Sequence, residues 1–383
     1  MTSTLSAALS RRAFLRSTAA TGATLLLAPA CGDYPAESGV AYAPWRFAES
    51  EDRPHLLAAG AALLAASPHN TQPWLFDVQP GRIDVFADPT KSLGAMDGLH
   101  REMHLGLGCA VENLLLTVET LGRNAELTWM PDPDDETHVA RVVLSEGAAR
   151  SSALADAIPF RHTNRGPYLD APPPPSLEPT LRDVVRSDEA TLVFLADAEA
   201  KATFRRQTVE ATRAIVGDDE MNEASHAWYR HSRAAIVEHR DGTTLDATGN
   251  GSAIRFLGKT SARPSAAKAG GYWLDSTRGP QTTAAAYVIL STADRSDRTQ
   301  QLRCGRAFQR IHLWAAAEGW ALQPLNQMAE RQDREQVLGL EPTFTQALRA
   351  LSGGDGAQML FRIGVPWEDA GPSPRRPLEW VTR

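Results

Sequence analysis

Hydrophobic and polar positions along the first part of the chain alternate with two periods, one typical of helices and one of short strands. Apolar residues three and four apart predict a helix over residues 52–67 and a second one over 100–121. Alternation predicts a short strand over 83–86, and the residues 139–144 predict a second strand. The second helix should end at Gly122, because glycine readily adopts the left-handed conformation that terminates a helix.

The second part of the chain repeats this order of elements. The pattern predicts a strand over residues 191–195, helices over 200–216 and 303–318, and a closing strand over 359–365. A shift of 197 residues matches small and apolar positions of the two long helices, pairing Gly108 with Gly305, Ala110 with Ala307, Leu116 with Leu313 and Gly122 with Gly319. The repeat predicts an α+β fold made of two halves, 52–150 and 151–383, each a small mixed sheet packed with helices. Residues 228–279 have little apolar period and are expected to form a lid-like excursion.

The N-terminal residues have the composition of an export signal. Arg11 and Arg12 precede a short apolar run, which is typical of a twin-arginine signal peptide over residues 1–31 and implies the twin-arginine export machinery as a partner. An accidental basic turn before a short helix is the alternative. Cys31 ends a stretch similar to a lipoprotein cleavage site, so a periplasmic protein, free or lipid-anchored through Cys31, is expected. Residues 32–51 should form a polar tether.

Composition limits the classes of partner. The net charge of −7 and the pI of about 5.8 argue against nucleic acid as a partner. After the leader, no apolar run approaches the roughly 20 residues that a transmembrane helix needs. The two remaining cysteines, Cys109 and Cys304, fall within predicted helices and are interpreted as small core residues rather than a disulfide framework.

Two groups of polar residues could bind a flavin nucleotide. The segment from Ser67 to Trp74 carries Asn70 and Gln72, whose side chains offer a donor and an acceptor together, as the edge of a flavin ring requires. The same residues also suit an ordinary helix-ending turn. Further cationic and hydroxyl groups that could hold a phosphate monoester are Arg161, Thr163, Arg165, Arg375 and Arg376.

These motifs and their order resemble the nitroreductase superfamily. Ser-x-x-Asn-x-Gln-Pro-Trp over 67–74 resembles its flavin loop, and the His-Asn-Thr-Gln-Pro-Trp form is similar to the Acg family, in which two nitroreductase-like halves are fused. Residues 158–165 resemble the phosphate element, 305–325 the core helix and the turn beneath the flavin, and 362–377 the closing strand and basic tail. The resemblance covers roughly residues 52–380.

The resemblance implies FMN as the cofactor and assigns roles within one composite site. Ser67, Asn70 and Gln72 would hold the ring edge, and Arg161, Thr163, Arg165 and Arg375 or Arg376 the phosphate. The turn formed by Gln323, Pro324 and Leu325 would offer backbone N–H groups to the far side of the ring. The flavin loop occurs only in the first half and the arginine clusters only in the second, so one FMN is expected per chain, in a monomer that acts as a pseudo-dimer.

The implied activity is oxidoreduction by the flavin itself, between small-molecule donors and acceptors, with no separate catalytic side chain. An FMN-sequestering protein without turnover, or a binding module without flavin, is the alternative. Zinc binding is not expected at His100 and His104, because the intervening glutamate stands at the third position rather than the second and no third ligand is evident. Neither a dinucleotide-binding glycine pattern nor a nucleophile elbow is found.

Overall fold

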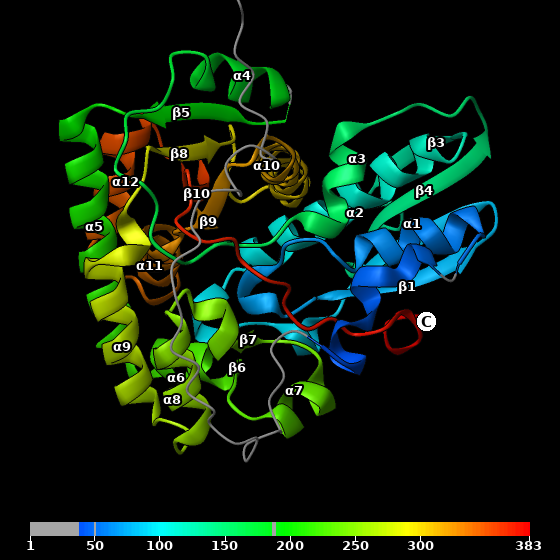
Figure 1. Ribbon diagram of the computed structural model, residues 1–383. Helices are drawn as coiled ribbons and strands as arrows, with labels where there is room; N and C mark the ends of the chain where they lie inside the picture. The colour runs from blue at the N-terminus through cyan, green and yellow to red at the C-terminus, as the bar shows by residue number, and fades with distance from the viewer. Residues whose placement is uncertain (1–37, 50, 186–188) are drawn as a thin grey trace, which may run out of the picture. The chain divides into compact units, whose positions relative to one another are not determined.

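The computed structural model describes residues 38–49, 51–185 and 189–383 (Figure 1). The expected signal peptide, Cys31 and the first residues of the expected tether lie outside the described residues. All the described residues fall within the unit Pro35–Arg383. Helices and strands both contribute to this unit, which confirms the α+β class.

The first half contains a four-stranded sheet in the order β1-β2-β4-β3. Each neighbouring pair is antiparallel, with Trp74 opposite Ala87 in the first pair and Arg123 opposite Glu146 in the last. The two main helices, α1 and α2, pack against each other and against the sheet. The elements are α1 (Pro54–Ala62), β1 (Trp74–Gln79), β2 (Arg82–Ala87), α2 (Arg101–Thr120), β3 (Arg123–Trp129), β4 (His138–Glu146) and α3 (Ala153–Ala157).

The second half has a sheet in the order β5-β8-β10-β9, again with antiparallel pairs. Every residue of β10 is buried, as befits a strand in the middle of a covered sheet. The framework elements are α4 (Leu177–Val184), β5 (Thr191–Leu195), β8 (Ala286–Ser291), α10 (Arg298–Glu318), β9 (Ala321–Pro324) and β10 (Ala357–Gly364). The inserted elements are α5 (Ala198–Val216), α6 (Asp219–Ala227), β6 (Tyr229–Arg230), α7 (Arg233–His239), β7 (Thr243–Thr244), α8 (Ser252–Thr260), α9 (Ala266–Arg278), α11 (Gln327–Leu338) and α12 (Thr343–Ser352).

The two long helices, α2 and α10, cross at a pair of glycines. A Cβ atom on Gly108 would lie 2.0 Å from the carbonyl oxygen of Leu302, and one on Gly305 would lie 2.1 Å from that of Leu105. Leu105 and Leu302 are themselves 197 residues apart, so the crossing is symmetric under the shift found in the sequence. Only glycine allows the two backbones to approach this closely. One hydrophobic cluster contains residues of both halves, including Val142 and Phe361, so the halves share a core.

The structure differs from the sequence-based expectations, or adds to them, at four points. The two four-stranded sheets are antiparallel rather than mixed, and only the short pair β6-β7 among the described strands is parallel. Residues Val40–Glu49 form a 3₁₀ helix instead of a tether, because Tyr42 is buried and the indole of Trp45 donates a hydrogen bond to the Ser373 carbonyl at 2.8 Å. The excursion 228–279 is largely helical. Strands β1 and β3 were missed by the periodicity.

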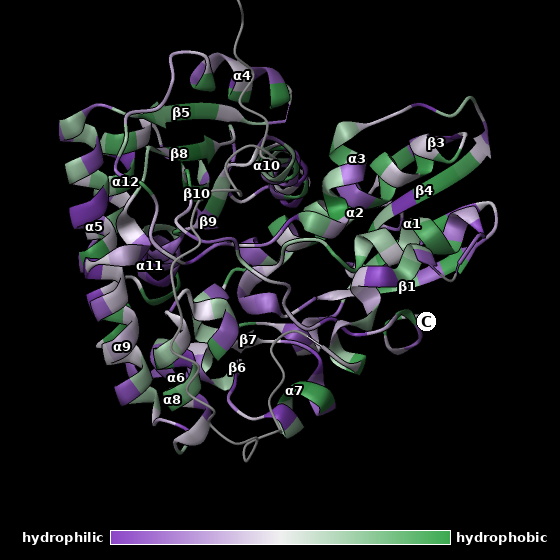
Figure 2. Ribbon diagram, in the orientation of Figure 1, coloured by the Kyte–Doolittle hydropathy of each residue, from purple (hydrophilic) through white to green (hydrophobic). Residues whose placement is uncertain are grey.

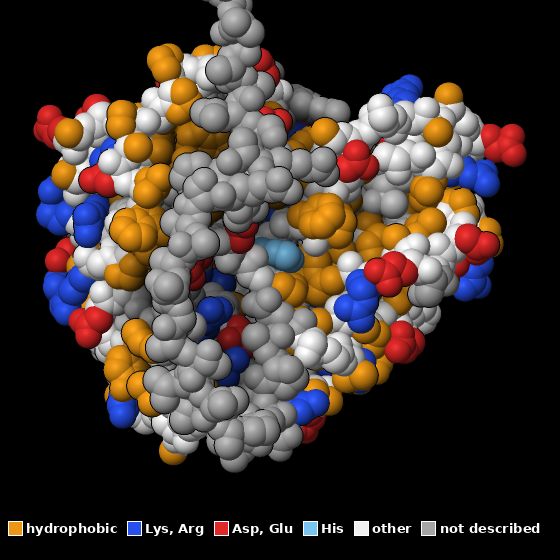
Figure 3. All heavy atoms as spheres, viewed as in Figure 1, with side chains coloured by type: hydrophobic (Ala, Val, Ile, Leu, Met, Phe, Trp, Pro, Cys, Tyr) orange, Lys and Arg blue, Asp and Glu red, His pale blue; other side chains and the backbone are white. Residues whose placement is uncertain are grey.

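The distribution of polarity differs between sheets and helices. Figure 2 shows β5 and β8 as mostly hydrophobic, whereas α5 and α11 carry many hydrophilic residues. In α11, nine consecutive residues from Gln327 to Glu335 are nevertheless buried, and most of them are polar or charged. Acidic and basic side chains are interspersed over the face shown in Figure 3. Across the described residues, no helix combines the length and apolar character needed to cross a bilayer.

Candidate functional site

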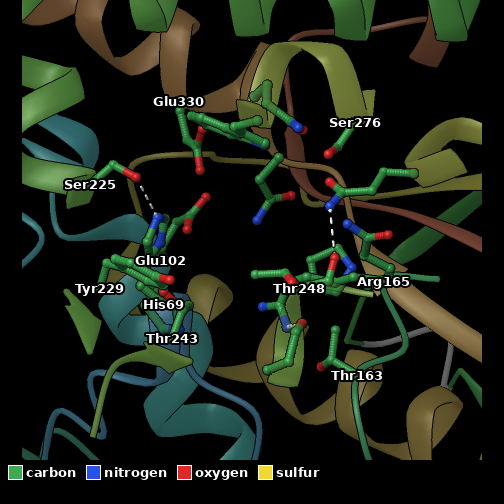
Figure 4. Close-up of a pocket in the computed structure, with 18 of the residues that line it drawn as sticks. His69, Glu102, Thr163, Arg165, Ser225, Tyr229, Thr243, Thr248, Ser276 and Glu330 are labelled. Carbon is green, nitrogen blue, oxygen red and sulfur yellow. Dashed lines mark hydrogen bonds between the residues drawn. The ribbon is translucent and has the colours of Figure 1, made fainter. Parts of the chain in front are cut away.

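A cavity of about 320 Å³ lies where the two halves meet the inserted helices. Its volume falls in the range of small-molecule binding sites. Leu105, Gly106 and Cys109 of α2 and Phe308 of α10 give it an apolar wall, and the segment from Asn222 to Gln281 closes another side. Figure 4 shows Arg165 and Thr163 on one side of this cavity, with His69, Glu102 and Glu330 on the other.

Five of the residues expected to bind the cofactor line this cavity. They are Ser67, Thr163, Arg165, Gln323 and Pro324. The guanidinium of Arg165 donates a hydrogen bond to the carbonyl of Ala247 at 3.1 Å, which connects it to the excursion 228–279. Gly249 lies against the backbone of Arg165 at this contact. Its φ is 77°, and a Cβ atom there would lie 2.2 Å from the Arg165 carbonyl carbon, so only glycine fits. The excursion thus forms a wall of the cavity.

The flavin-loop residues Asn70 and Gln72 do not line the cavity. The amide of Asn70 donates hydrogen bonds to the carbonyls of Gly242 and Pro374, at 3.1 and 2.9 Å. The amide of Gln72 donates to the carbonyl of Arg240 at 2.9 Å and accepts from the backbone N–H of Arg376 at 2.8 Å. These side chains join the C-terminal tail to the excursion, and their contact with a ring edge stays a prediction.

The backbone of this loop is unusual. His69, Asn70 and Gln72 have φ values of 45°, 58° and 52°, in the left-handed region that non-glycine residues seldom adopt. The hydrogen bonds of the two amides hold this conformation, and the imidazole Nε2 of His69 lies 2.9 Å from the hydroxyl of Ser225 in α6. Such a constrained loop beside a cavity is typical of a functional site.

Arg161 and Arg375 also lie outside the cavity lining, but they form a buried cationic cluster with two histidines. The two arginine residues are only 2% and 3% exposed. Arg161 donates to the Leu64 carbonyl at 3.0 Å and Arg375 to the Ala65 carbonyl at 3.2 Å. Neither forms an ion pair with any carboxylate of the described residues. Burial lowers the pKa of Arg161 to about 10, and burial together with the charge of Arg161 holds that of Arg375 well below its usual value.

The polar atoms of this cluster are not all satisfied. The Nε atoms of Arg161 and Arg375 and the Nε2 atom of His162 are buried without a hydrogen-bond partner. Burial and the Arg161 charge lower the pKa of His162 to about 3. His312 accepts from Arg161 through Nδ1 at 3.2 Å and contacts the His162 carbonyl through Nε2 at 3.3 Å, so Nε2 carries its proton. Buried positive charge with unsatisfied donors is the arrangement that an anion stabilises.

Residues 161–165 connect the buried cationic cluster to the cavity. Arg161 belongs to the cluster, whereas Thr163 and Arg165 line the cavity. The charge of Arg165 also contributes to the lowered pKa of His312. Trp45 covers the cluster, with its ring centroid 4.8 Å from the guanidinium carbon of Arg375.

Two other expected site residues have structural roles. The guanidinium of Arg376 donates to the carbonyl of Thr71 at 2.6 Å and so holds the loop, while its Nε atom is buried without a partner and its phosphate role stays a prediction. Leu325 is fully buried, and its backbone N–H donates to the Leu360 carbonyl at 2.7 Å. Gln323 and Pro324 belong to strand β9 instead of a turn, because β9 pairs with β10. The expectation of free backbone N–H groups at 323–325 is therefore corrected for Leu325.

Sequence reasoning missed the acidic side of the cavity. Glu102 and Glu330 both line it and are 5% exposed. The sequence of α11 could have indicated it, because a dense group of charged residues there is flanked by apolar residues on both sides. Cys109 and Cys304 are buried and free, as expected, and burial raises the pKa of both thiols. No cluster of metal-ligating side chains occurs among the residues that the structure describes.

Comparisons with known proteins show which proteins have a similar sequence. No protein-family model matches the sequence. A protein of Mycobacterium tuberculosis (strain ATCC 25618 / H37Rv) named "Putative NAD(P)H nitroreductase Rv3131" is 27% identical over 326 residues, which is 84% of this chain and 88% of the relative. The chain is therefore similar in sequence to a protein named as a putative nitroreductase. A second protein of that strain, "Putative NAD(P)H nitroreductase acg", is 26% identical over 344 residues, covering 85% of this chain and 93% of the relative.

A solved structure gives a weaker match. The FMN and NADPH-dependent nitroreductase NfnB from sphigopyxis sp. strain HMH is 18% identical, with a TM-score of 0.39. The match covers 60% of this chain and 97% of that one. The two sequence relatives support the resemblance to the nitroreductase superfamily that the motifs suggested.

Proposed function

We propose that the protein binds FMN and acts as a flavin-dependent oxidoreductase. The observation that carries this proposal is the pair of buried guanidinium groups, Arg161 and Arg375, with unsatisfied Nε donors and no acidic partner among the described residues. A phosphate monoester supplies the negative charge and the acceptor oxygens that this cluster lacks. The cavity beside it would take the ring, between the apolar wall of α2 and α10 and the polar side of Thr163 and Arg165.

The residues of the chain would bind and orient the cofactor. Arg161 and Arg375 would hold the phosphate, each offering an Nε donor that has no partner within the protein. Leu105 and Phe308 offer apolar contact to an aromatic ring, and Ser67 and Gln323 add polar atoms to the cavity wall. Bound FMN supplies reversible exchange of one or two electrons at its ring.

The division of the site between the halves supports one FMN per chain. Ser67 comes from the first half, whereas Arg161, Thr163 and Arg165 belong to the second. The two sheets have the same strand order, and α2 and α10 cross symmetrically. We therefore propose a pseudo-dimer of two copies of one unit in a single chain, acting as a monomer.

A nicotinamide donor and a small-molecule acceptor are proposed as the electron partners. The alternative is an FMN-sequestering protein, which the helical wall from Asn222 to Ser276 favours because it encloses the cavity. Anaerobic mixing of the FMN-loaded protein with NADH or NADPH separates the two. Loss of the oxidised flavin absorbance, followed by its return with an acceptor, supports turnover. An unchanged spectrum supports sequestration, and failure to bind FMN contradicts both.

Export by the twin-arginine route, to a periplasmic or lipid-anchored location, remains part of this proposal. The paired guanidinium groups of Arg11 and Arg12 are the feature that the export machinery would read. Replacing both with lysine should leave precursor in the cytoplasm. Unchanged export of the double variant would contradict this route.

A further inference from the structure

Four carboxyl groups and two guanidinium groups lie together at the acidic side of the cavity. The carboxyl groups belong to η5 (Gly94–Asp97), α2 and α11, and the guanidinium groups to α2 and the segment before α10. They are Asp97, Glu102, Glu330 and Asp333, and Arg101 and Arg295. All four carboxyl residues are at most 5% exposed, so water cannot solvate them as it would at a surface.

Two of these carboxyl groups have structural partners. Asp333 accepts from Arg101 at 2.8 Å and also pairs with Arg295. Although burial alone would raise its pKa, the two guanidinium charges lower it, so Asp333 is ionised. Asp97 accepts from the backbone N–H groups of Glu102 and Met103, at 3.0 and 2.9 Å, and caps the start of α2. Neither aspartate lines the cavity.

Glu102 and Glu330 face the cavity and are less well satisfied. Glu102 accepts from Arg101 at 3.2 Å, but Arg101 already serves Asp333. The Oε2 atom of Glu330 is buried and has no hydrogen-bond partner. Figure 4 shows both side chains projecting into the cavity from the side opposite Arg165.

The charge balance favours a bound proton, although a hydrogen bond from the Asn326 side chain supports the charged form of Glu102. Two guanidinium groups can neutralise two of the four carboxylates. If the charge of Arg165, across the cavity, is also counted, one carboxylate still has no positive charge to balance it. The histidines of the cavity do not supply the charge, since burial lowers the pKa of His69 to about 4 and also lowers that of His226. Burial, with the neighbouring carboxylates adding to it, raises the pKa of Glu102 to about 7 and that of Glu330 well above its usual value.

We propose that Glu102 and Glu330 form the proton donor of the cavity, holding a proton at its wall and delivering it to the group that is reduced there. This inference rests on the proposed function. Overall, a dihydronicotinamide, a proton and an oxidised acceptor yield the nicotinamide cation and the acceptor with two added hydrogens. The carboxyl O–H bond breaks, and its proton moves to the acceptor atom that has gained the electron pair. The carboxylate that remains regains a proton from water after the product leaves.

The pH dependence follows from the direction of the shift. The proton is present on Glu102 below about pH 7 and is lost as the pH rises through that value, so turnover should fall as the pH is raised. General acid catalysis contributes roughly 10²–10⁴-fold to a rate. Glu330→Gln and Glu102→Gln keep the size of each side chain but cannot release a carboxyl proton.

Glu335→Gln is the matched control. Glu335 lies on α11 like Glu330 and is also 5% exposed, but it does not line the cavity. Its carboxylate accepts from the backbone N–H groups of Phe344 and Thr345, at 2.7 and 3.0 Å. The substitution therefore removes a buried carboxylate of the same helix without changing the cavity wall.

The first experiment uses the protein without flavin. An infrared titration between pH 5 and 9 should reveal a protonated carboxyl carbonyl band that persists near pH 7. Glu330→Gln or Glu102→Gln should weaken this band, and Glu335→Gln should leave it intact. Absence of the band above pH 6, or the same band in all three variants, would overturn the proposal.

The second experiment uses the FMN-loaded protein and turnover with NADH and a small acceptor at pH 6. Glu330→Gln should lower turnover about 10²–10⁴-fold while FMN affinity is retained, and Glu335→Gln should not. If Glu330→Gln turns over like Glu335→Gln, the donor role is wrong although the proposed function stands. If no variant binds FMN, the proposed function fails and the donor role fails with it.

Discussion

The two halves of the molecule share a framework but differ in what is inserted into it. In the first half, β1 and β2 are joined by Pro80 and Gly81 alone, whereas β5 and β8 are separated by the helices α5 to α9. The β3–β4 connection holds no helix, whereas α11 and α12 separate β9 from β10. The cavity lies against these insertions, because Asn222, Tyr229 and Glu330 all come from them. A symmetric framework therefore carries an asymmetric site.

The framework part of this comparison depends on the crossing of α2 and α10. Gly305→Ala would place a methyl group 2.1 Å from the Leu105 carbonyl oxygen, and backbone cannot yield as a flexible side chain does. We expect a destabilisation at or above the upper end of the about 1–3 kcal/mol typical of overpacking. Gly108→Ala should behave alike, because the crossing is symmetric. Urea unfolding measures both.

Gly271→Ala is the control for this substitution. Gly271 lies within α9, and nothing would approach its Cβ within 4 Å. Alanine is favoured over glycine in a helix by about 1 kcal/mol, so this variant should be as stable as the parent or more so. If Gly305→Ala is tolerated like Gly271→Ala, the two helices do not cross at these glycines.

The site part of the comparison depends on the buried cationic cluster. Arg161→Met keeps much of the side-chain volume but removes a charged donor, which is worth roughly 1.5–3 kcal/mol. FMN affinity should fall about 10- to 150-fold, and riboflavin affinity should hardly change because riboflavin lacks the phosphate. Fluorescence titration with both ligands measures the ratio. Equal weakening of both ligands would show that Arg161 does not bind the phosphate.

Arg165→Ala sharpens the result in the same titration. The sequence grouped Arg165 with the phosphate residues, whereas its side chain lies in the cavity wall. Weaker binding of both ligands would assign Arg165 to the ring, and weaker binding of FMN alone would extend the phosphate site to it. An unchanged affinity for both would leave Arg165 as a contact of the excursion, through Ala247.

A smaller effect concerns a pair of residues related by the 197-residue shift. The Nδ1 atom of His104 lies 2.7 Å from the amide oxygen of Gln301. Burial lowers the pKa of His104 to about 4, so its neutral form stabilises the fold above about pH 6.5, and this stability is lost as the pH falls toward 4. His104→Gln makes the pair symmetric and should reduce the loss of stability in acid.

Urea unfolding at pH 7 and pH 5 measures this difference. His239→Gln, which changes an exposed histidine of α7, is the control and should leave the pH dependence as it is. An identical acid sensitivity of His104→Gln and the parent would show that His104 does not contribute through its protonation.

The framework could be predicted from the sequence because its elements repeat. The 197-residue shift identified the two helices that pack together, and Gly108 and Gly305 are the residues at their crossing. Strand β5 has the predicted bounds, Thr191–Leu195, because a short continuous run of apolar and β-branched residues favours a strand. Strands β1 and β3 were missed because few of their side chains are fully buried: two in β1 and none in β3, although exposure alternates along β3.

The site was predicted less completely, because its residues act through long-range contacts. Asn70 and Gln72 have the chemistry of a ring contact, but hydrogen bonds to Gly242 and Arg240, some 170 residues away, use their amides. Glu102 and Glu330 are 228 residues apart, and neither belongs to a motif. Charge that becomes buried only on folding cannot be recognised from the spacing of residues in the sequence.

The number of FMN molecules bound per chain tests the central claim most directly. A symmetric framework with one asymmetric site should bind one FMN, which the flavin absorbance of the reconstituted protein and the protein concentration together measure. We expect a ratio near one. A ratio near two would mean that each half builds a site, and a protein that cannot be reconstituted with FMN would contradict the account.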